Sequence, residues 1–242
     1  MAHGQPDFGA YAPKKTVGSM ADNAELAARL GSIVTYDRKG DVVFLDGFES
    51  GLSPYLIAGA GTGWSVTQSN EHSRNGGFSA KLVCGSNGVR EARLHKHLPY
   101  PTLGNLGFEA SFTLHADVEY VLFYLAIYDG TNLIEGQIQF DQDNSRLRYR
   151  NEFGPFTTIE DGLRLYEHND MFNTLKFMVD FVNSNYVRVM LNERTWSLAG
   201  IPVNTSLSGF APHIACNVYC RGVAAKNATI FVDDFIVTQN EP

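Results

Sequence analysis

The stretch that decides the fold is EYVLFYLAIYDGTNLIEGQIQFDQDNSRLRYR, residues 119–150. It contains three runs in which apolar and polar side chains alternate, and turn-forming Asp, Gly and Asn residues separate the runs. Alternation with a period of two is typical of β-strands, because successive side chains point to opposite faces of a sheet. The stretch therefore predicts three consecutive antiparallel strands.

The same alternation assigns the side chains of these strands to two faces. One face carries the apolar residues expected in the core, namely Val121, Phe123, Leu125, Ile127, Ile138 and Phe140. If the three strands are neighbours, the opposite face brings together Tyr124, Tyr128, Gln137, Gln139, Arg146 and Arg148. Three interpretations of this face stay open: a plain solvated surface, an interface between subunits, or a platform that binds sugar through flat aromatic, amide and guanidinium groups.

Comparable runs, separated by Gly, Asn, Asp and Pro, follow one another from Asp41 to the end of the chain. About a dozen strands at this spacing, with no linker or internal repeat between them, are typical of a single sandwich. The 242 residues are 44% hydrophobic, which is enough to fill its core. We therefore predict an all-β, two-sheet antiparallel sandwich over residues 41–242.

Residues 1–40 have a different character and are expected to form a separate N-terminal arm. They begin with Gly, Pro and aromatic residues that show no periodicity, which predicts an extended segment. One short helix is expected over residues 21–30, which are rich in helix formers and are followed by Gly31. The side chains expected to anchor this arm to a partner are Phe8, Tyr11, Leu26 and Leu30.

Several motifs carry a resemblance to a known fold family. They are DGFESG at 46–51, GWSV at 63–66, HSRNGGFSAKL at 72–82 and IFVDDFIV at 230–237. In this order they resemble the first and last strands of carbohydrate-binding-module jelly rolls, and residues 173–198 are similar to the hairpin of concanavalin A-like sandwiches. The resemblance implies that the last strand lies beside the first. This architecture hosts lectins, glycanases and viral proteins alike.

The resemblance also implies a structural Ca²⁺ ion where the first and last strands meet. Ca²⁺ prefers carboxylate and carbonyl oxygens. The matching residues are Glu49 and Asp234, with a carbonyl near Asn75 or Gly76 and with Asp46 or Asp233 as substitutes. The alternative is that these acidic residues are exposed or cap turns.

A second one-sided stripe consists of Glu91, Arg93, His95 and His97. Side chains two apart on a strand stand about 7 Å apart on one face, so one interpretation of the two imidazoles is half of a Zn²⁺ site. No third ligand has recognisable spacing, which favours a solvated or partner-facing edge over a metal site.

The N-terminus and the cysteines predict where the chain is made. No basic start followed by an apolar segment is present, so we expect no secretion signal. The three cysteines, Cys84, Cys216 and Cys220, lack the spacing of a disulfide framework and are expected to be small buried side chains. Both observations favour a chain made in a reducing cytoplasm.

Composition and motifs exclude several classes of function. A net charge of −7 excludes nucleic-acid binding through bulk positive charge, and no apolar run is long enough to span a membrane. The Glu-x-Asp-x-x-Glu string of glucanases on this fold is absent, as are nucleophile-elbow, zinc-protease and phosphate-loop motifs. The sequence therefore predicts a protein that is not an enzyme.

These observations predict a structural protein of a virion, a capsid decoration or tail protein of a phage. It would be assembled in the host cytoplasm, anchored by its N-terminal arm to other virion subunits, and homo-oligomeric. The alternative is a carbohydrate-binding module or glycan-binding adhesin, and a third interpretation is a diverged glycan hydrolase or lyase.

Overall fold

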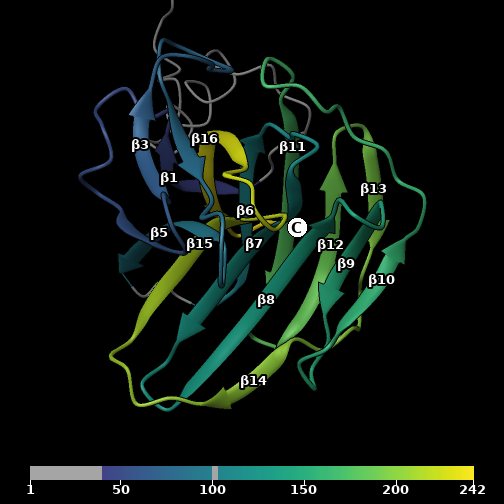
Figure 1. Ribbon diagram of the computed structural model, residues 1–242. Helices are drawn as coiled ribbons and strands as arrows, with labels where there is room; N and C mark the ends of the chain where they lie inside the picture. The colour runs from purple at the N-terminus through teal and green to yellow at the C-terminus, as the bar shows by residue number, and fades with distance from the viewer. Residues whose placement is uncertain (1–39, 100–102) are drawn as a thin grey trace, which may run out of the picture.

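The computed structural model describes residues 40–99 and 103–242, which form sixteen strands and no helix (Figure 1). The predicted arm and short helix, with Phe8, Tyr11, Leu26 and Leu30, lie outside the described residues. No helix that could cross a membrane occurs in the part of the chain that is described.

The strands are β1 (Asp41–Asp46), β2 (Leu56–Ala60), β3 (Ser65–Ser69), β4 (Ser79–Val83), β5 (Glu91–Pro99), β6 (Asn105–Phe112), β7 (Val118–Tyr128), β8 (Asn132–Asp141), β9 (Arg146–Arg150), β10 (Phe156–Glu160), β11 (Asn173–Asp180), β12 (Asn185–Leu191), β13 (Arg194–Ser197), β14 (Asn204–Leu207), β15 (His213–Gly222) and β16 (Thr229–Gln239).

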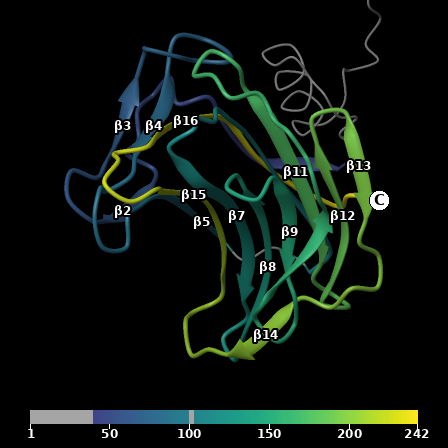
Figure 2. The same ribbon diagram turned by 45° about the vertical axis from the view of Figure 1, so that its right-hand side comes forward.

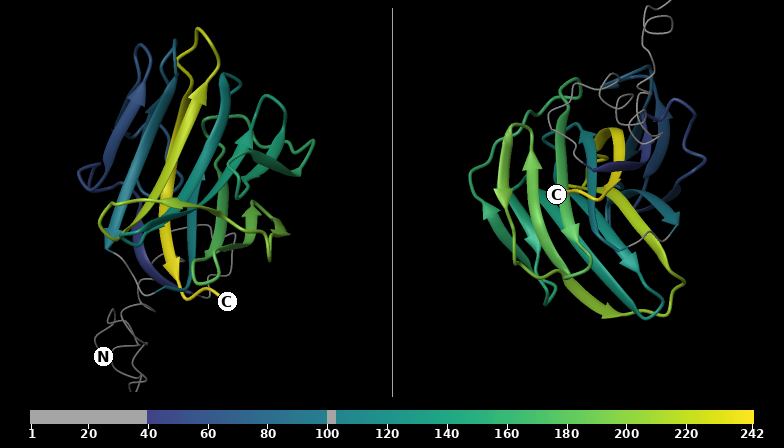
Figure 3. Two further views of the ribbon diagram at one scale, coloured as in Figure 1. Left: turned by 90° about the horizontal axis from the view of Figure 1, so that it is seen from below. Right: turned by 180° about the vertical axis from the view of Figure 1, so that it is seen from behind.

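The strands form two antiparallel sheets of eight strands each, which confirms the all-β two-sheet prediction. The first sheet has the order β13-β12-β11-β6-β16-β4-β3, with β1 also paired to β16. The second has the order β10-β9-β8-β7-β15-β5-β2, with β14 also paired to β8. Figure 2 shows β5, β15, β7, β8 and β9 of the second sheet side by side. Seen from behind, β11 to β13 of the first sheet come forward in green (Figure 3).

The core lies between the sheets and is built by the predicted alternation. Val121, Phe123, Leu125 and Ile127 of β7 are fully buried, as expected from their shared face. Phe123 contacts Phe108 of the opposite sheet, with ring centroids 6.0 Å apart. Burial of these apolar side chains against the facing sheet is the main source of stability.

The first and last strands of the sandwich pair, as the family resemblance implies. Asp41 to Asp46 of β1 run antiparallel to Phe235 to Gln239 of β16, with one irregularity between Val42 and Phe44. β16 also pairs with β4 and β6, so the last strand lies inside the first sheet.

The end of the chain is fastened to the first sheet by a buried ion pair. The carboxylate of Glu241 contacts the ammonium group of Lys176 in β11, and both side chains are almost completely buried. The Thr238 hydroxyl donates to the same Glu241 oxygen, and Arg188 lies 3.6 Å from the other oxygen. Through Lys176 of β11 and Arg188 of β12, Glu241 therefore joins the end of the chain to two strands of the first sheet.

Candidate functional site on the outer face of the second sheet

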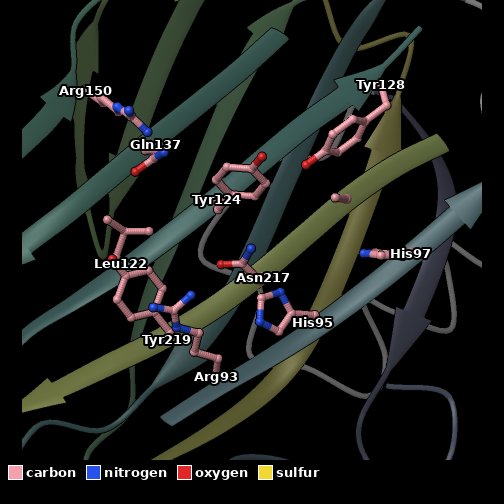
Figure 4. A pocket seen from close by; sticks show the side chains of 11 residues that line it. Arg93, His95, His97, Leu122, Tyr124, Tyr128, Gln137, Arg150, Asn217 and Tyr219 are labelled. Atoms are coloured by element: carbon pink, nitrogen blue, oxygen red, sulfur yellow. The ribbon is translucent and has the colours of Figure 1, made fainter. Parts of the chain in front are cut away.

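The outer face of the second sheet, the face turned away from the core, has a hollow of about 340 Å³ (Figure 4). Strands β5, β7, β8, β9 and β15 supply its walls and floor. The lining side chains are Arg93, His95, His97, Leu122, Tyr124, Tyr128, Gln137, Arg150, Ala215, Asn217 and Tyr219.

Strand register explains why these side chains converge. Asn217 of β15 pairs with His95 of β5 on one side and with Tyr124 of β7 on the other, and Tyr124 pairs with Gln137 of β8. Directly paired residues stand side by side on one face of a sheet. Four strands thus place an imidazole, two amides and a phenol in one transverse row. In the next row Ala215 pairs with Ala126, and these small side chains leave room for the hollow.

The charged groups in the lining are all basic. Arg93 and Arg150 line the hollow, whereas no aspartate or glutamate does. Each guanidinium is held from the side by a nearly buried carboxylate: Arg150 Nη1 lies 2.7 Å from Glu135, and Arg93 contacts Glu91. Both arginine side chains remain partly exposed. They are therefore positioned donors that can still contact a ligand.

Asn217 is a buried amide with one unsatisfied atom. Its side-chain oxygen has no hydrogen-bond partner, although the residue is only 7% exposed. Figure 4 shows the amide between Tyr124 and His95. An unsatisfied buried acceptor is costly, so a ligand hydroxyl that reached this oxygen would gain a hydrogen bond that the free protein lacks.

The site holds His95 neutral and Tyr124 protonated. Burial, assisted by the nearby Arg93 and His97, lowers the pKa of His95 to about 4. Burial also raises the pKa of Tyr124 well above its ordinary value, and the neighbouring Glu135 and Tyr128 add to that shift. At neutral pH the imidazole can accept a proton, whereas the phenol can only donate one.

Aromatic rings border the hollow at both ends. At one end Tyr128 stacks on His213, with ring centroids 4.3 Å apart, and Phe210 meets Tyr128 edge to face at 5.6 Å. At the other end the guanidinium of Arg93 lies 5.0 Å from the ring centre of Tyr219. Such flat surfaces suit the apolar faces of sugar rings.

The structure divides the six outer-face residues that the sequence singled out. Tyr124, Tyr128 and Gln137 line the hollow. The other three lie on the same face outside it: Arg148 contacts Asp141 at 2.9 Å and Gln139 at 2.6 Å, and Arg146 contacts Asp161 at 2.7 Å. Gln137 and Gln139 are also buried rather than solvated, and the Arg148 guanidinium donates to Gln139.

Sequence reasoning missed Asn217 and Tyr219, and it separated Arg93, His95 and His97 from the tyrosine face. All five belong to one hollow because β15 lies between β5 and β7. The alternation in HIACNVYC contained the signal, since Asn217 and Tyr219 share a face, but the order of the strands did not follow from it.

The stripe with His95 and His97, for which the sequence favours a solvated or partner-facing edge over a Zn²⁺ site, lies on β5 at the hollow. His97 packs against His213, with ring centroids 4.6 Å apart. Among residues 40–99 and 103–242 no three His, Cys, Asp or Glu side chains are placed to hold a metal ion together.

The residues expected to hold Ca²⁺ do not fit that ion as they are arranged. The Arg74 guanidinium lies 2.8 Å from Asp234, and the Asn75 amide donates to both Asp234 oxygens. Glu49 accepts hydrogen bonds from the backbone N–H groups of Gly77 and Phe78. A cation and several N–H donors thus occupy the carboxylates that Ca²⁺ would need.

Comparison with known proteins identifies the fold. No protein-family model and no curated sequence matches the chain. Among solved structures, it is similar to an endo-β-1,4-glucuronan lyase from the fungus Trichoderma reesei, with a TM-score of 0.57 and 9% identity over 82% of this chain and 96% of that one. It is also similar to the cellulose-induced protein Cip1, with a TM-score of 0.55 and 18% identity over 81% and 96% of the two chains. The chain thus has the concanavalin A-like jelly-roll fold that its motifs resemble.

A third similar structure comes from a virus of bacteria. It is a carbohydrate esterase of the Shiga toxin-encoding bacteriophage phi24B, with a TM-score of 0.50 and 19% identity over 77% of this chain and 90% of that one. At such identities the likeness establishes the fold alone.

Proposed function

We propose that the outer face of the second sheet binds an acidic polysaccharide and holds a uronate unit in the hollow. The observation that carries this proposal is the lining, in which Arg93 and Arg150 are present and carboxylates are absent. A planar guanidinium binds a carboxylate through two parallel hydrogen bonds, and it keeps its charge at any physiological pH. The glucuronan lyase among the similar structures acts on a polymer of this class.

The remaining lining suits the rest of a sugar unit. Asn217 and Gln137 offer amide groups to ring hydroxyls, and the aromatic rings at both ends of the hollow can cover the faces of neighbouring units. The hollow lies on an open sheet face, so a chain can continue beyond it in both directions.

The direct test compares one polymer in two chemical forms. We expect binding to a polyuronate, measured by calorimetry or on a glycan array, and much weaker binding to the same polymer after its carboxyl groups are reduced to alcohols. Equal affinity for both forms would reject the proposed specificity for acidic polymers. Failure to bind any glycan would reject glycan binding as the function.

Exchanging Arg150 and its partner Glu135 for neutral side chains should weaken binding of the polyuronate about 10–100-fold. A hydrogen bond to a charged group contributes about 1.5–3 kcal/mol. The double variant Arg150→Gln with Glu135→Gln removes both charges together, so neither is left buried alone.

The matched control is Arg146→Gln with Asp161→Asn, an exposed ion pair outside the hollow between Arg146, on the same strand as Arg150, and Asp161, which follows β10. Its affinity should stay within about twofold of the wild type. Equal loss in both double variants would point to general charge attraction rather than to a uronate site.

Eliminative cleavage of the bound polymer is the second candidate function. It is an alternative to the sequence-based prediction that the protein is not an enzyme. His95 and Tyr124 flank Asn217 in the protonation states that this step needs. His95 would take the proton from C5 of the uronate, the electron pair would form a C4=C5 double bond, and the C4–O4 bond would break. The departing O4 would take the Tyr124 proton, while Arg150 balances charge on the carboxylate.

Elimination leaves a conjugated double bond, so ultraviolet absorbance reports it. We expect absorbance to rise and the polymer to shorten when the protein is incubated with a polyuronate. An unchanged polymer under conditions in which binding is measured would exclude this activity and leave binding as the function.

A role as a virion component stays a prediction. The bacteriophage esterase among the similar structures supports a phage setting for this fold, and glycan binding by the sandwich is compatible with it. The anchoring residues lie outside the described part of the chain. Deleting residues 1–31 should abolish particle binding or oligomer formation while glycan binding persists; assembly that survives the deletion would reject the anchor.

A further inference from the structure

We propose that Cys84 and Cys220 form a disulfide bond that joins the two sheets when the chain folds in an oxidising environment. The two Sγ atoms lie 2.7 Å apart, and both cysteines are fully buried. This separation is about 0.7 Å longer than a disulfide bond of roughly 2.05 Å, so a small side-chain movement closes the bond.

The two cysteines are held in place by their surroundings. Cys84 follows β4 of the first sheet; its N–H donates to the Ala228 carbonyl, and its own carbonyl accepts from the Asn227 amide, at 2.8 and 2.9 Å. Cys220 lies in β15 of the second sheet, paired with Ala92 and Val121 on its two sides. Both sulfur atoms are thus positioned before any bond forms.

The bond would connect parts of the chain that are 136 residues apart. Cross-linking such distant residues restricts the unfolded chain strongly, which raises stability. It would also tie β15, the strand that carries Asn217 and Tyr219, to the end of β4. Both effects of the disulfide bond, on stability and on β15, are independent of what the hollow binds.

The burial of both sulfur atoms determines at which stage of folding the disulfide bond can form. It raises the pKa of the Cys220 thiol, so few thiolates exist in the folded state, and no small oxidant reaches a fully buried sulfur. The reaction therefore takes place while the chain folds, as the two segments come together. A chain that folds in a reducing compartment keeps both thiols.

The oxidant is a small-molecule disulfide such as oxidised glutathione. One cysteine thiolate attacks it, which forms a mixed disulfide and releases one glutathione thiolate. The second cysteine thiolate then attacks the protein sulfur of the mixed disulfide and releases the second glutathione. The protein loses two hydrogens and two thiols become one S–S bond, while the oxidised glutathione is reduced to two thiols.

Cys216 provides an internal control. It is buried four residues before Cys220 in the same strand, and its side chain points to the core as well. Side chains four apart on a strand stand about 13 Å apart, so Cys216 and Cys220 cannot pair. Two cysteines are therefore expected to react and one to stay free.

The test refolds the full chain from denaturant with a mixture of oxidised and reduced glutathione, then counts thiols under denaturing conditions and maps cross-linked peptides by mass spectrometry. We expect the mass to fall by two hydrogens, one free thiol at Cys216, and a peptide that joins Cys84 to Cys220. The melting temperature of the oxidised form should exceed that of the reduced form by about 10 °C.

Three serine variants make the result decisive. Cys216→Ser should keep the bond and the melting shift, whereas Cys84→Ser and Cys220→Ser should each lose both. Three free thiols in a refolded protein, or a bond that includes Cys216, would overturn the proposal.

Discussion

Replacing Glu241 by alanine is expected to lower the free energy of unfolding by about 3–5 kcal/mol. The Glu241 carboxylate is fully buried and is the partner of the equally buried Lys176 ammonium group. Without it, the buried Lys176 ammonium group loses its contact with this carboxylate, and Arg188 nearby adds a second positive charge. The buried Glu109, which pairs with Lys176 between β6 and β11, stays in place. Breaking a buried pair by removing one member is destabilising to this extent.

Urea denaturation of the two proteins, followed by fluorescence, measures this loss. The matched control is Glu71→Ala, which removes a half-exposed partner of Lys81 and should change stability by less than about 1 kcal/mol. Replacing both members, with Lys176→Met and Glu241→Leu, should recover part of the loss because neither charge of this pair is then left without the other. A Glu241→Ala protein as stable as the control variant would mean that the C-terminal pair does not form.

Replacing His95 by alanine is expected to lower the rate of polyuronate elimination about 10²–10⁴-fold, which is the usual contribution of a general base. Tyr124→Phe should cause a comparable loss because it removes only the hydroxyl that donates the proton. Phenylalanine keeps the ring, so polymer binding should fall far less than the rate. Variants that cleave at the wild-type rate would exclude both residues from the reaction.

The pH dependence gives this reaction a signature. The lowered pKa of His95, about 4, leaves the imidazole neutral as the pH falls from 7 to 5, so the rate should hold over that range and be half lost near pH 4. An unperturbed histidine, with a pKa near 6.5, would lose half of the rate near pH 6.5. A profile of the second kind would show that His95 is not the base or is not buried in the active protein.

The sequence predicted about a dozen of the sixteen strands, and the four that it missed are all short. They are β2, β10, β13 and β14, each four or five residues long. Three of these lie at the ends of the sheet orders, where a strand has one neighbour and much exposed surface. An edge strand needs no strict alternation of apolar residues, so the pattern that revealed the central strands was absent.

The sequence brought together only those residues of the hollow that lie on strands adjacent in the chain. Tyr124 and Gln137 lie on consecutive strands joined by a tight turn, so their shared face followed from local alternation. Asn217 and His95 belong to strands more than a hundred residues apart in the chain, and only the finished sheet places them beside Tyr124. The meeting of Cys84 with Cys220 depends in the same way on the packing of one sheet on the other.

The sequence by itself thus determined the strand class, the core-facing side chains of the central strands and the pairing of the first and last strands implied by their motifs. The strand class and the core-facing side chains depend on the period of two, which is a local property of the backbone, whereas the pairing of the first and last strands was implied by the family resemblance. Only the tertiary structure decided which strands are neighbours, that a hollow lined by arginines opens over Ala215, and that Arg74 lies against Asp234 where Ca²⁺ was expected. Neighbour order and register result from side-chain packing summed over both sheets, and no single segment contains that information.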